Sequence, residues 1–123
     1  MRELELQQRI LLALGSRPGV RIWRSNTGVA YAPLTTRGRA ALAALSSSGD
    51  IRPIRYGVPG QADLTGILAP SGQRLELEVK SPSGRARIAQ KAYASMVAAH
   101  GGRYAVVRSV ADALAAVGID SND

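Results

Sequence analysis

Two carboxylates and an amine occur in the second half of the chain at a spacing suited to chemistry on phosphate. Glu78 and Lys80 stand two residues apart in a run, Leu75 to Lys80, where apolar and polar residues alternate. That alternation is typical of a β-strand, and side chains two apart on a strand project from the same face. Asp63 precedes the turn-forming residues Ala69 to Gly72, so a β-hairpin would bring it beside the other two.

These three groups together indicate metal-assisted hydrolysis of a phosphodiester. Mg²⁺ prefers oxygen ligands and keeps several of its waters. A metal held by carboxylates polarises a phosphoryl oxygen and lowers the pKa of a bound water. The lysine can position that water or offset negative charge in the transition state. The alternative for an isolated Glu-x-Lys is an amphipathic strand whose outer face carries a salt bridge.

The residues around these groups form a longer pattern. Residues Gly57 to Asp63 read Gly-x-x-Gly-x-x-Asp, residues Glu78 to Lys80 read Glu-x-Lys, and Gln90 follows on the next predicted helix. Asn26-Thr27-Gly28 adds an upstream loop after a predicted strand. In this order and spacing, the pattern resembles the VRR-NUC family, a branch of the PD-(D/E)XK nuclease superfamily.

The resemblance implies a role for each matching residue. Asp63 and Glu78 would bind the metal, Mg²⁺ or Mn²⁺, and the main-chain carbonyl of Val79 would be a further ligand. Lys80 would be the catalytic lysine, and Gln90 would orient groups beside the site.

The family also uses a glutamate on its first helix, for which this chain offers Glu3 and Glu5. We favour Glu3 because it shares a helical stripe with Gln7, Ile10 and Leu14. The alternative for either glutamate is an acid at a helix start that complements the helix dipole.

For the whole protein, the resemblance implies an α/β fold of the restriction-endonuclease-like type, with a mixed central β-sheet flanked by helices. It covers residues 3 to 108 apart from 32 to 52, and we predict a single nuclease domain over residues 1–123. Stand-alone members of the family resemble Holliday junction resolvases, which act on branched DNA as homodimers. A dimer is reasonable physically because two sites are needed to cut two strands symmetrically.

The charge of the chain indicates a polyanionic partner. The formal net charge is +7, and the stretch from Arg9 to Gln61 holds eight arginines against one acid, Asp50. Nucleic acid is the usual partner of such a basic protein. The arginines predicted to contact DNA are Arg24, Arg55, Arg85 and Arg87. The alternative for Arg85 and Arg87 is a solvated surface.

The pattern of apolar residues predicts the elements that position the site. Helices are predicted at Glu3–Leu14, Thr36–Leu45, Arg87–His100 and Val110–Val117. Strands are predicted at Val20–Arg24, Ile51–Tyr56, Gln61–Leu68, Gln73–Lys80 and Arg103–Arg108. The apolar faces of two helices are predicted to consist of Leu4, Ile10, Leu11 and Leu14, widened by Leu6, and of Ile88, Tyr93, Met96 and Val97. This order of elements indicates a mixed sheet with helices packed against it.

A few smaller features lead to expectations of their own. Ser46 to Asp50 is predicted as a flexible loop. Trp23 is expected in the core, with a platform for base stacking as the alternative. Gly57 and Gly60 either make a turn or let a DNA backbone approach closely. His100 is expected as a cation at a helix end rather than as a catalytic group.

Composition excludes several classes of protein. The chain has no cysteine, so disulfides and Cys-ligated zinc are ruled out, and the reducing cytosol is the expected compartment. No apolar run approaches the ~18 residues of a membrane-spanning helix. Two rival functions remain, a catalytically idle nucleic-acid-binding module and a structural interaction subunit, and binding of a divalent metal would discriminate them from a nuclease.

Overall fold

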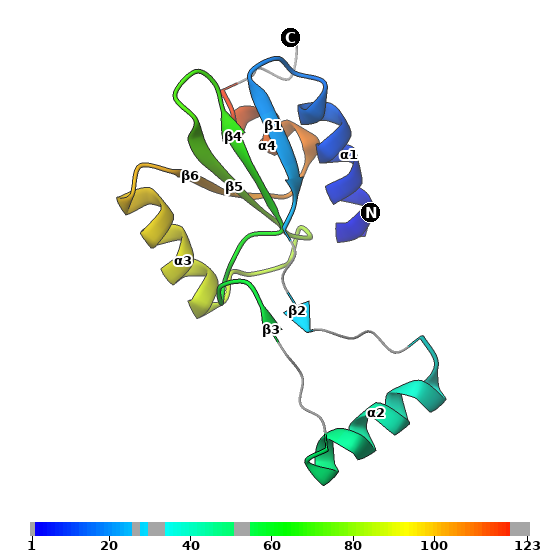
Figure 1. The fold of residues 1–123 in the computed structure, drawn as a ribbon. Coiled ribbons are helices and arrows are strands. Elements are labelled where there is room, and N and C mark those ends of the chain that lie inside the picture. Colours follow the sequence, from blue (N-terminus) through cyan, green and yellow to red (C-terminus); the bar gives the residue numbers. More distant parts are fainter. Residues whose placement is uncertain (1, 26–27, 30–33, 51–54, 119–123) are drawn as a thin grey trace. The chain divides into compact units, whose positions relative to one another are not determined.

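The computed structural model describes residues 2–25, 28–29, 34–50 and 55–118 (Figure 1). The helices are α1 (Glu3–Gly15), α2 (Thr36–Ser48), α3 (Ile88–Ala99) and α4 (Val110–Ala116). The strands are β1 (Val20–Arg24), β2 (Gly28–Val29), β3 (Arg55–Tyr56), β4 (Leu64–Leu68), β5 (Gln73–Val79) and β6 (Arg103–Val107). Contacts divide the chain into two compact units, which we call the sheet unit (Met1–Ser25 with Pro59–Asp123) and the inserted segment (Asn26–Val58).

The sheet unit is built on four strands in the order β1-β4-β5-β6. β4 is antiparallel to both of its neighbours, and it joins β5 through the predicted turn over residues 69–72. β5 and β6 are parallel, and α3 forms the crossover that a parallel pair requires. The predicted α/β class with a mixed sheet and flanking helices is therefore confirmed.

One face of the sheet carries the apolar core. Leu6, Ile10 and Leu14 of α1 are buried against it, and α4 adds Ala113 and Leu114. The strands contribute Val20, Leu64, Leu68, Leu75, Leu77, Val79 and Val107. Each fully buried aliphatic side chain of this size stabilises the fold by roughly 1.5–3 kcal/mol.

The opposite face of the sheet is covered in part by α3, which Figure 1 shows on the side away from α1 and α4. Tyr93 and Val97 of α3 are buried, and the ring of Tyr93 meets that of Tyr104 edge-on at a centroid distance of 6.1 Å. Because both faces of β5 are covered, the polar residues Glu76 and Glu78 that alternate with its leucines are buried as well. The salt bridge of the alternative interpretation is present, with Nζ of Lys80 3.3 Å from Glu78, but it is largely shielded from solvent rather than on a solvated outer face.

Several predicted positions are corrected by the structure. Leu4 is 55 % exposed and Leu6 takes its place in the core, because the helical stripe through Ile10 and Leu14 passes through position 6. On α3, Ile88 and Met96 are exposed rather than buried.

The inserted segment contains α2 and a two-stranded ladder in which β2 and β3 are antiparallel. The α2 helix runs three residues beyond its predicted end, so Ser46 to Ser48 are helical and not loop. Thr35 caps its start by accepting a hydrogen bond from the amide of Gly38. Gly49 ends it in a left-handed conformation with φ of 85°, which glycine adopts without steric cost.

The predicted strand over 51–56 is described only as β3, since residues 51–54 lie outside the described part. The prediction of one domain over 1–123 stays a prediction, because the contacts divide into two units. None of the helices in the described ranges is long and apolar enough to cross a membrane.

Candidate active site

Asp63 lies directly before β4. There its side chain, rather than its main chain, binds the neighbouring strand β5. Its Oδ2 accepts a hydrogen bond of 2.8 Å from the amide of Val79, and its carbonyl accepts one of 2.9 Å from the amide of Ser25. The sequence placed Asp63 inside a strand over 61–68. The observed strand starts three residues later, at Leu64, and at position 63 the carboxylate binds the amide of Val79 in β5.

Glu78 lies near the end of β5 and is held by two cationic or polar neighbours. Its Oε1 accepts a hydrogen bond of 2.8 Å from Nε2 of Gln90, and the Nζ of Lys80 lies 3.3 Å from the same oxygen. The side chains of Glu78 and Lys80 are 5 % and 12 % exposed. The predicted group of Asp63, Glu78, Lys80 and Gln90 is therefore brought together at one end of the β4–β5 hairpin.

Gln90 has a second contact that explains its fixed position. Its Oε1 accepts a hydrogen bond from the amide of Arg87, the residue before α3, in the arrangement of a capping box. Gln90 thus ties the first turn of α3 to the carboxylate of Glu78. Arg87 and His100 cap the two ends of the helix, which begins and ends one residue inside each predicted boundary.

The electrostatics of the site favour a proton or a cation on the carboxyl pair. Burial raises the pKa of Glu78 to about 7, with the negative charge of Asp63 adding to the shift and Lys80 opposing it. Burial likewise raises the pKa of Asp63, against the hydrogen bond from Val79. The Oε2 of Glu78 is buried and has no hydrogen-bond partner among the described residues.

Glu3 reaches the edge of this group from the start of α1. Its Oε1 accepts a hydrogen bond of 3.1 Å from the amide of Ser81, directly after Lys80. Glu5 instead forms an exposed ion pair of 3.1 Å with Arg9. Of the two glutamates left open by the sequence, Glu3 is the one that lies against the hairpin.

The arginines predicted to contact DNA lie outside this cluster. Arg24 ends β1 and is exposed, and Arg85 and Arg87 are exposed before α3. The side chain of Arg55 is outside the described part of the structure. Gly60, left open as a turn or a point of approach for DNA, packs against α3, since a Cβ there would lie 2.0 Å from the carbonyl oxygen of Ala89.

The sequence interpretation missed a second buried carboxylate on the same face. Glu76 is fully buried, and its Oε1 accepts hydrogen bonds from the hydroxyl of Thr65 at 2.9 Å and from Nε of Arg74 at 2.6 Å. The hydroxyl of Tyr104 is also buried, and its pKa is raised by burial and by the charge of Glu78. The sequence signal that could have placed Glu76 on this face is the charged residue at every second position from Arg74 to Lys80.

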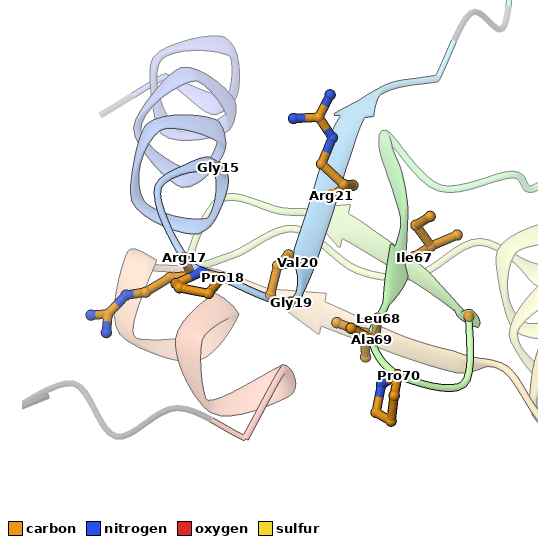
Figure 2. Close-up of a pocket in the computed structure, with 11 residues that line it drawn as sticks. Gly15, Arg17, Pro18, Gly19, Val20, Arg21, Ile67, Leu68, Ala69 and Pro70 are labelled. Atoms are coloured by element: carbon orange, nitrogen blue, oxygen red, sulfur yellow. The ribbon is translucent and has the colours of Figure 1, made fainter.

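Several hollows lie on the sheet unit, and two of them bear on the site. One of about 210 Å³ adjoins the site and is lined by Glu3, Arg9, Lys80 and Arg108 among others. The other, of about 420 Å³, lies at the opposite ends of β1 and β4, where Arg17, Pro18, Ile67 and Pro70 surround it (Figure 2). Its lining residues include no acid, so it offers no carboxylate ligand for a metal.

The carboxyl pair fits a hard divalent cation. No group of three or more His, Cys, Asp or Glu side chains suited to a metal occurs in the described ranges. Mg²⁺ is commonly bound through only one or two carboxylates, with waters and substrate phosphates as the other ligands. Asp63 and Glu78 meet that requirement, since both have a raised pKa and one oxygen of Glu78 is buried without a hydrogen-bond partner in the described part of the chain.

Comparison of the chain with protein-family models, with curated proteins and with solved structures finds no match. The relation to the VRR-NUC family stays a prediction that rests on the residues named above.

Proposed function

We propose that the protein is an endonuclease that hydrolyses phosphodiester bonds in DNA with the help of Mg²⁺ or Mn²⁺. The observation that carries this proposal is the pair of carboxyls on Asp63 and Glu78, partly or fully buried, with the amine of Lys80 at 3.3 Å from Glu78. Two like charges held together away from water are unfavourable unless a cation joins them.

The residues that would hold the metal are Asp63, Glu78 and the carbonyl of Val79. That carbonyl leaves the extended strand on the same side as the Val79 amide, which binds Asp63. When bound there, the ion would supply Lewis acidity toward a phosphoryl oxygen and toward water. Gln90 would keep the carboxylate of Glu78 in one orientation through its 2.8 Å hydrogen bond.

Lys80 would act on the reacting groups directly. Its amine is largely shielded from solvent and already faces an acid of the site. An ammonium in that place can donate a hydrogen bond to the attacking water and offset the charge that develops on the phosphoryl oxygens. Glu3, bound to the amide next to Lys80, would add a further acid at the edge of the site.

The net charge of +7 supports a nucleic-acid substrate, and the hairpin that carries the site in a mixed sheet supports a restriction-endonuclease-like fold. We extend the proposal to branched DNA as substrate and to a homodimer as the active form, in which two sites cut two strands. Both extensions rest on the resemblance noted in the sequence.

The test is a cleavage assay on linear, nicked, flapped and four-way DNA, with and without Mn²⁺. We expect cleavage only with the metal, and a loss of roughly 10²-fold or more in Asp63→Asn and Glu78→Gln while DNA binding persists. Glu5→Gln is the matched control, since it removes an exposed acid of α1 that pairs with Arg9.

Each rival function predicts a different pattern in the same experiments. An idle binding module would bind DNA, cut none of the substrates, and show no rise in melting temperature with Mn²⁺. A structural subunit would neither bind nor cut. Full activity in either acid variant would contradict the proposed site.

A further inference from the structure

Trp23 lies on the exposed part of the sheet face that carries the candidate site. The core interpretation of this residue is wrong, because its side chain is 50 % exposed. In the register of the sheet, Trp23 pairs with Thr65, and Thr65 pairs with Glu76. All three side chains therefore project from one face, the same face as Asp63 and Glu78.

The register arranges this face in rows. One row contains Arg21, Ile67 and Arg74, and Ile67 is 47 % exposed while the side chain of Arg74 is 56 % exposed. The next row contains Trp23 and Thr65, and the row after it holds Asp63, whose carbonyl accepts the amide of Ser25. At about 3.3 Å per residue, successive rows are roughly 6–7 Å apart.

The chemistry of these rows is that of a surface for single-stranded nucleic acid. Such surfaces combine cations that follow the phosphates with aromatic rings on which unpaired bases stack. Trp23 and Ile67 supply a flat and an aliphatic apolar surface. Arg21 and Arg74 flank Ile67 in the same row, and Arg74 is also ion-paired through its Nε with the buried Glu76. In a duplex the faces of the bases are already stacked on one another except at its ends, so a tryptophan at the surface stacks most readily on an unpaired base.

We propose that Trp23 stacks on an unpaired nucleobase of the substrate, next to the phosphate that a metal held by Asp63 and Glu78 would contact. The inference deepens the proposed function, on which it rests for the identity of the substrate as nucleic acid. It assigns the substrate class as DNA with a single-stranded portion at the cut site, such as a flap, a gap or an opened junction.

The experiment uses intrinsic fluorescence, because Trp23 is the only tryptophan of the chain. The full-length wild-type protein is titrated in EDTA, so that no substrate is cut, with oligothymidylate, with a flapped duplex and with a blunt duplex. Binding is followed in parallel by anisotropy of an end-labelled strand. We expect the emission of Trp23 to be quenched by the single strand and the flapped duplex, and much less by the blunt duplex at equal saturation.

Variants separate stacking from folding. Trp23→Ala is expected to weaken binding of the single strand by roughly five- to a hundredfold and to leave blunt-duplex affinity nearly unchanged. Trp23→Phe keeps a ring and should retain most of the affinity. Leu12→Ala, which removes a 77 % exposed side chain from α1, is the control and should change neither.

Four outcomes would overturn the inference. The first is binding of the single strand without quenching, and the second is equal loss of single-strand and duplex affinity in Trp23→Ala. The third is a change of emission with protein concentration in the absence of DNA, which would mean that a second copy covers Trp23. The fourth is an emission maximum of the free protein typical of a buried indole, which would mean that the chain itself covers it.

These results are independent of cleavage. If DNA quenches the emission of Trp23 as expected but the protein cuts no substrate with Mn²⁺, the nuclease proposal fails and the stacking surface stands. If it cuts DNA without quenching, only the inference about Trp23 fails.

Discussion

The proximity of two acids makes the candidate site sensitive to pH. The pKa of Glu78 is raised from an ordinary value of 4.5 to about 7 by burial and by the charge of Asp63. Between those two values the folded protein holds a proton that the unfolded chain has released. Its stability therefore falls as the pH rises through this window, and the whole penalty, on the order of 3 kcal/mol at most, is present above pH 7.

We predict that the metal-free wild type loses several degrees in melting temperature relative to Glu78→Gln between pH 5 and pH 8. Comparison with this variant cancels the contribution of titrating groups that do not interact with Glu78, while the interaction with Asp63 remains part of the difference. Mn²⁺ should reverse this loss in melting temperature at pH 8 in the wild type only, because the cation replaces the proton. If the melting temperatures of the two proteins change equally with pH across this range, the raised pKa of Glu78 is contradicted.

Lys80 offers a second prediction at the level of one residue. Lys80→Met keeps most of the packing of a side chain that is only 12 % exposed, and removes its charge. We expect kcat to fall by roughly 10²-fold or more with little change in the affinity for DNA, since the amine acts on the transition state. Steady-state kinetics on a cleavable substrate measure this. A defect that disappears at saturating DNA would identify Lys80 as a ground-state phosphate contact.

Glu3 and Glu5 form a matched pair of acids on α1. We predict that Glu3→Gln lowers the cleavage rate by roughly tenfold or more, because its charge lies beside the hairpin through the Ser81 contact. Glu5→Gln should have almost no effect, since exposed ion pairs contribute little. A larger effect of the Glu5 variant would show that the other stripe of α1 faces the site.

At the level of elements, the site depends on how α3 begins next to the hairpin. Gly60 has φ of 82°, and a Cβ there would lie 2.0 Å from the carbonyl oxygen of Ala89, so the backbone has to shift. We predict that Gly60→Ala costs about 2 kcal/mol or more and also lowers cleavage, because the same shift moves Gln90 away from Glu78. Thermal melts and rates below the melting transition measure the two effects separately.

Gly15→Ala is the matched control for this change. Gly15 is the last residue of α1 and lacks a positive φ, and a Cβ added there would meet no atom within 4 Å. Alanine at this position should be neutral or slightly stabilising. If Gly60→Ala melts like this control, the packing of α3 at its first turn is looser than described.

Most elements could be predicted from the sequence because their signals are local. The alternation of residues in the β4–β5 hairpin and its turn each depend on residues close in the chain. So does the cap of α4, where the hydroxyl of Ser109 accepts a hydrogen bond from the amide of Asp112. The juxtaposition of Asp63 with Glu78 followed from the same hairpin. Neighbours in the sequence therefore carried both the pairing of β4 with β5 and the central pair of the candidate site.

The features that could not be predicted depend on contacts between distant elements. The burial of Glu76 and Glu78 requires α3 to cover a face that alternation alone leaves open to solvent. The exposure of Trp23 requires that α3 covers only part of that face, which no local pattern encodes. The helical stripe favoured Glu3 over Glu5, but the contact of Glu3 with the amide of Ser81 depends on where α1 meets the hairpin and could not be predicted.

At the level of the whole molecule, the inserted segment and the sheet unit are separate compact units. The segment over residues 26–58 carries four arginines and one acid, whereas Asp63, Glu78, Lys80 and Gln90 all belong to the sheet unit. We predict that replacing residues 26–58 by a short Gly-Ser linker preserves folding and the rise in melting temperature with Mn²⁺. The core of the sheet unit lies wholly outside the segment.

The same deletion should weaken the binding of DNA and reduce its dependence on salt. Each phosphate contact releases counterions, so a protein with six or more contacts loses ~10³-fold or more in affinity between 50 and 200 mM salt. Loss of four arginines is expected to flatten that slope. Affinity measured at several salt concentrations provides the test, and an unchanged slope would show that the segment makes no phosphate contacts.

The long connection between β1 and β4 also has a consequence for the order of folding. Val20 pairs with Leu68 across 48 positions of sequence, whereas Asp63 to Gln90 spans 28 consecutive residues. Closing the longer loop costs more entropy, so the hairpin and the β5–α3–β6 crossover have the lower barrier to form. The residues of the candidate site, Asp63, Glu78, Lys80 and Gln90, would then come together early on the folding pathway. Trp23 would join this face last, when β1 pairs with β4.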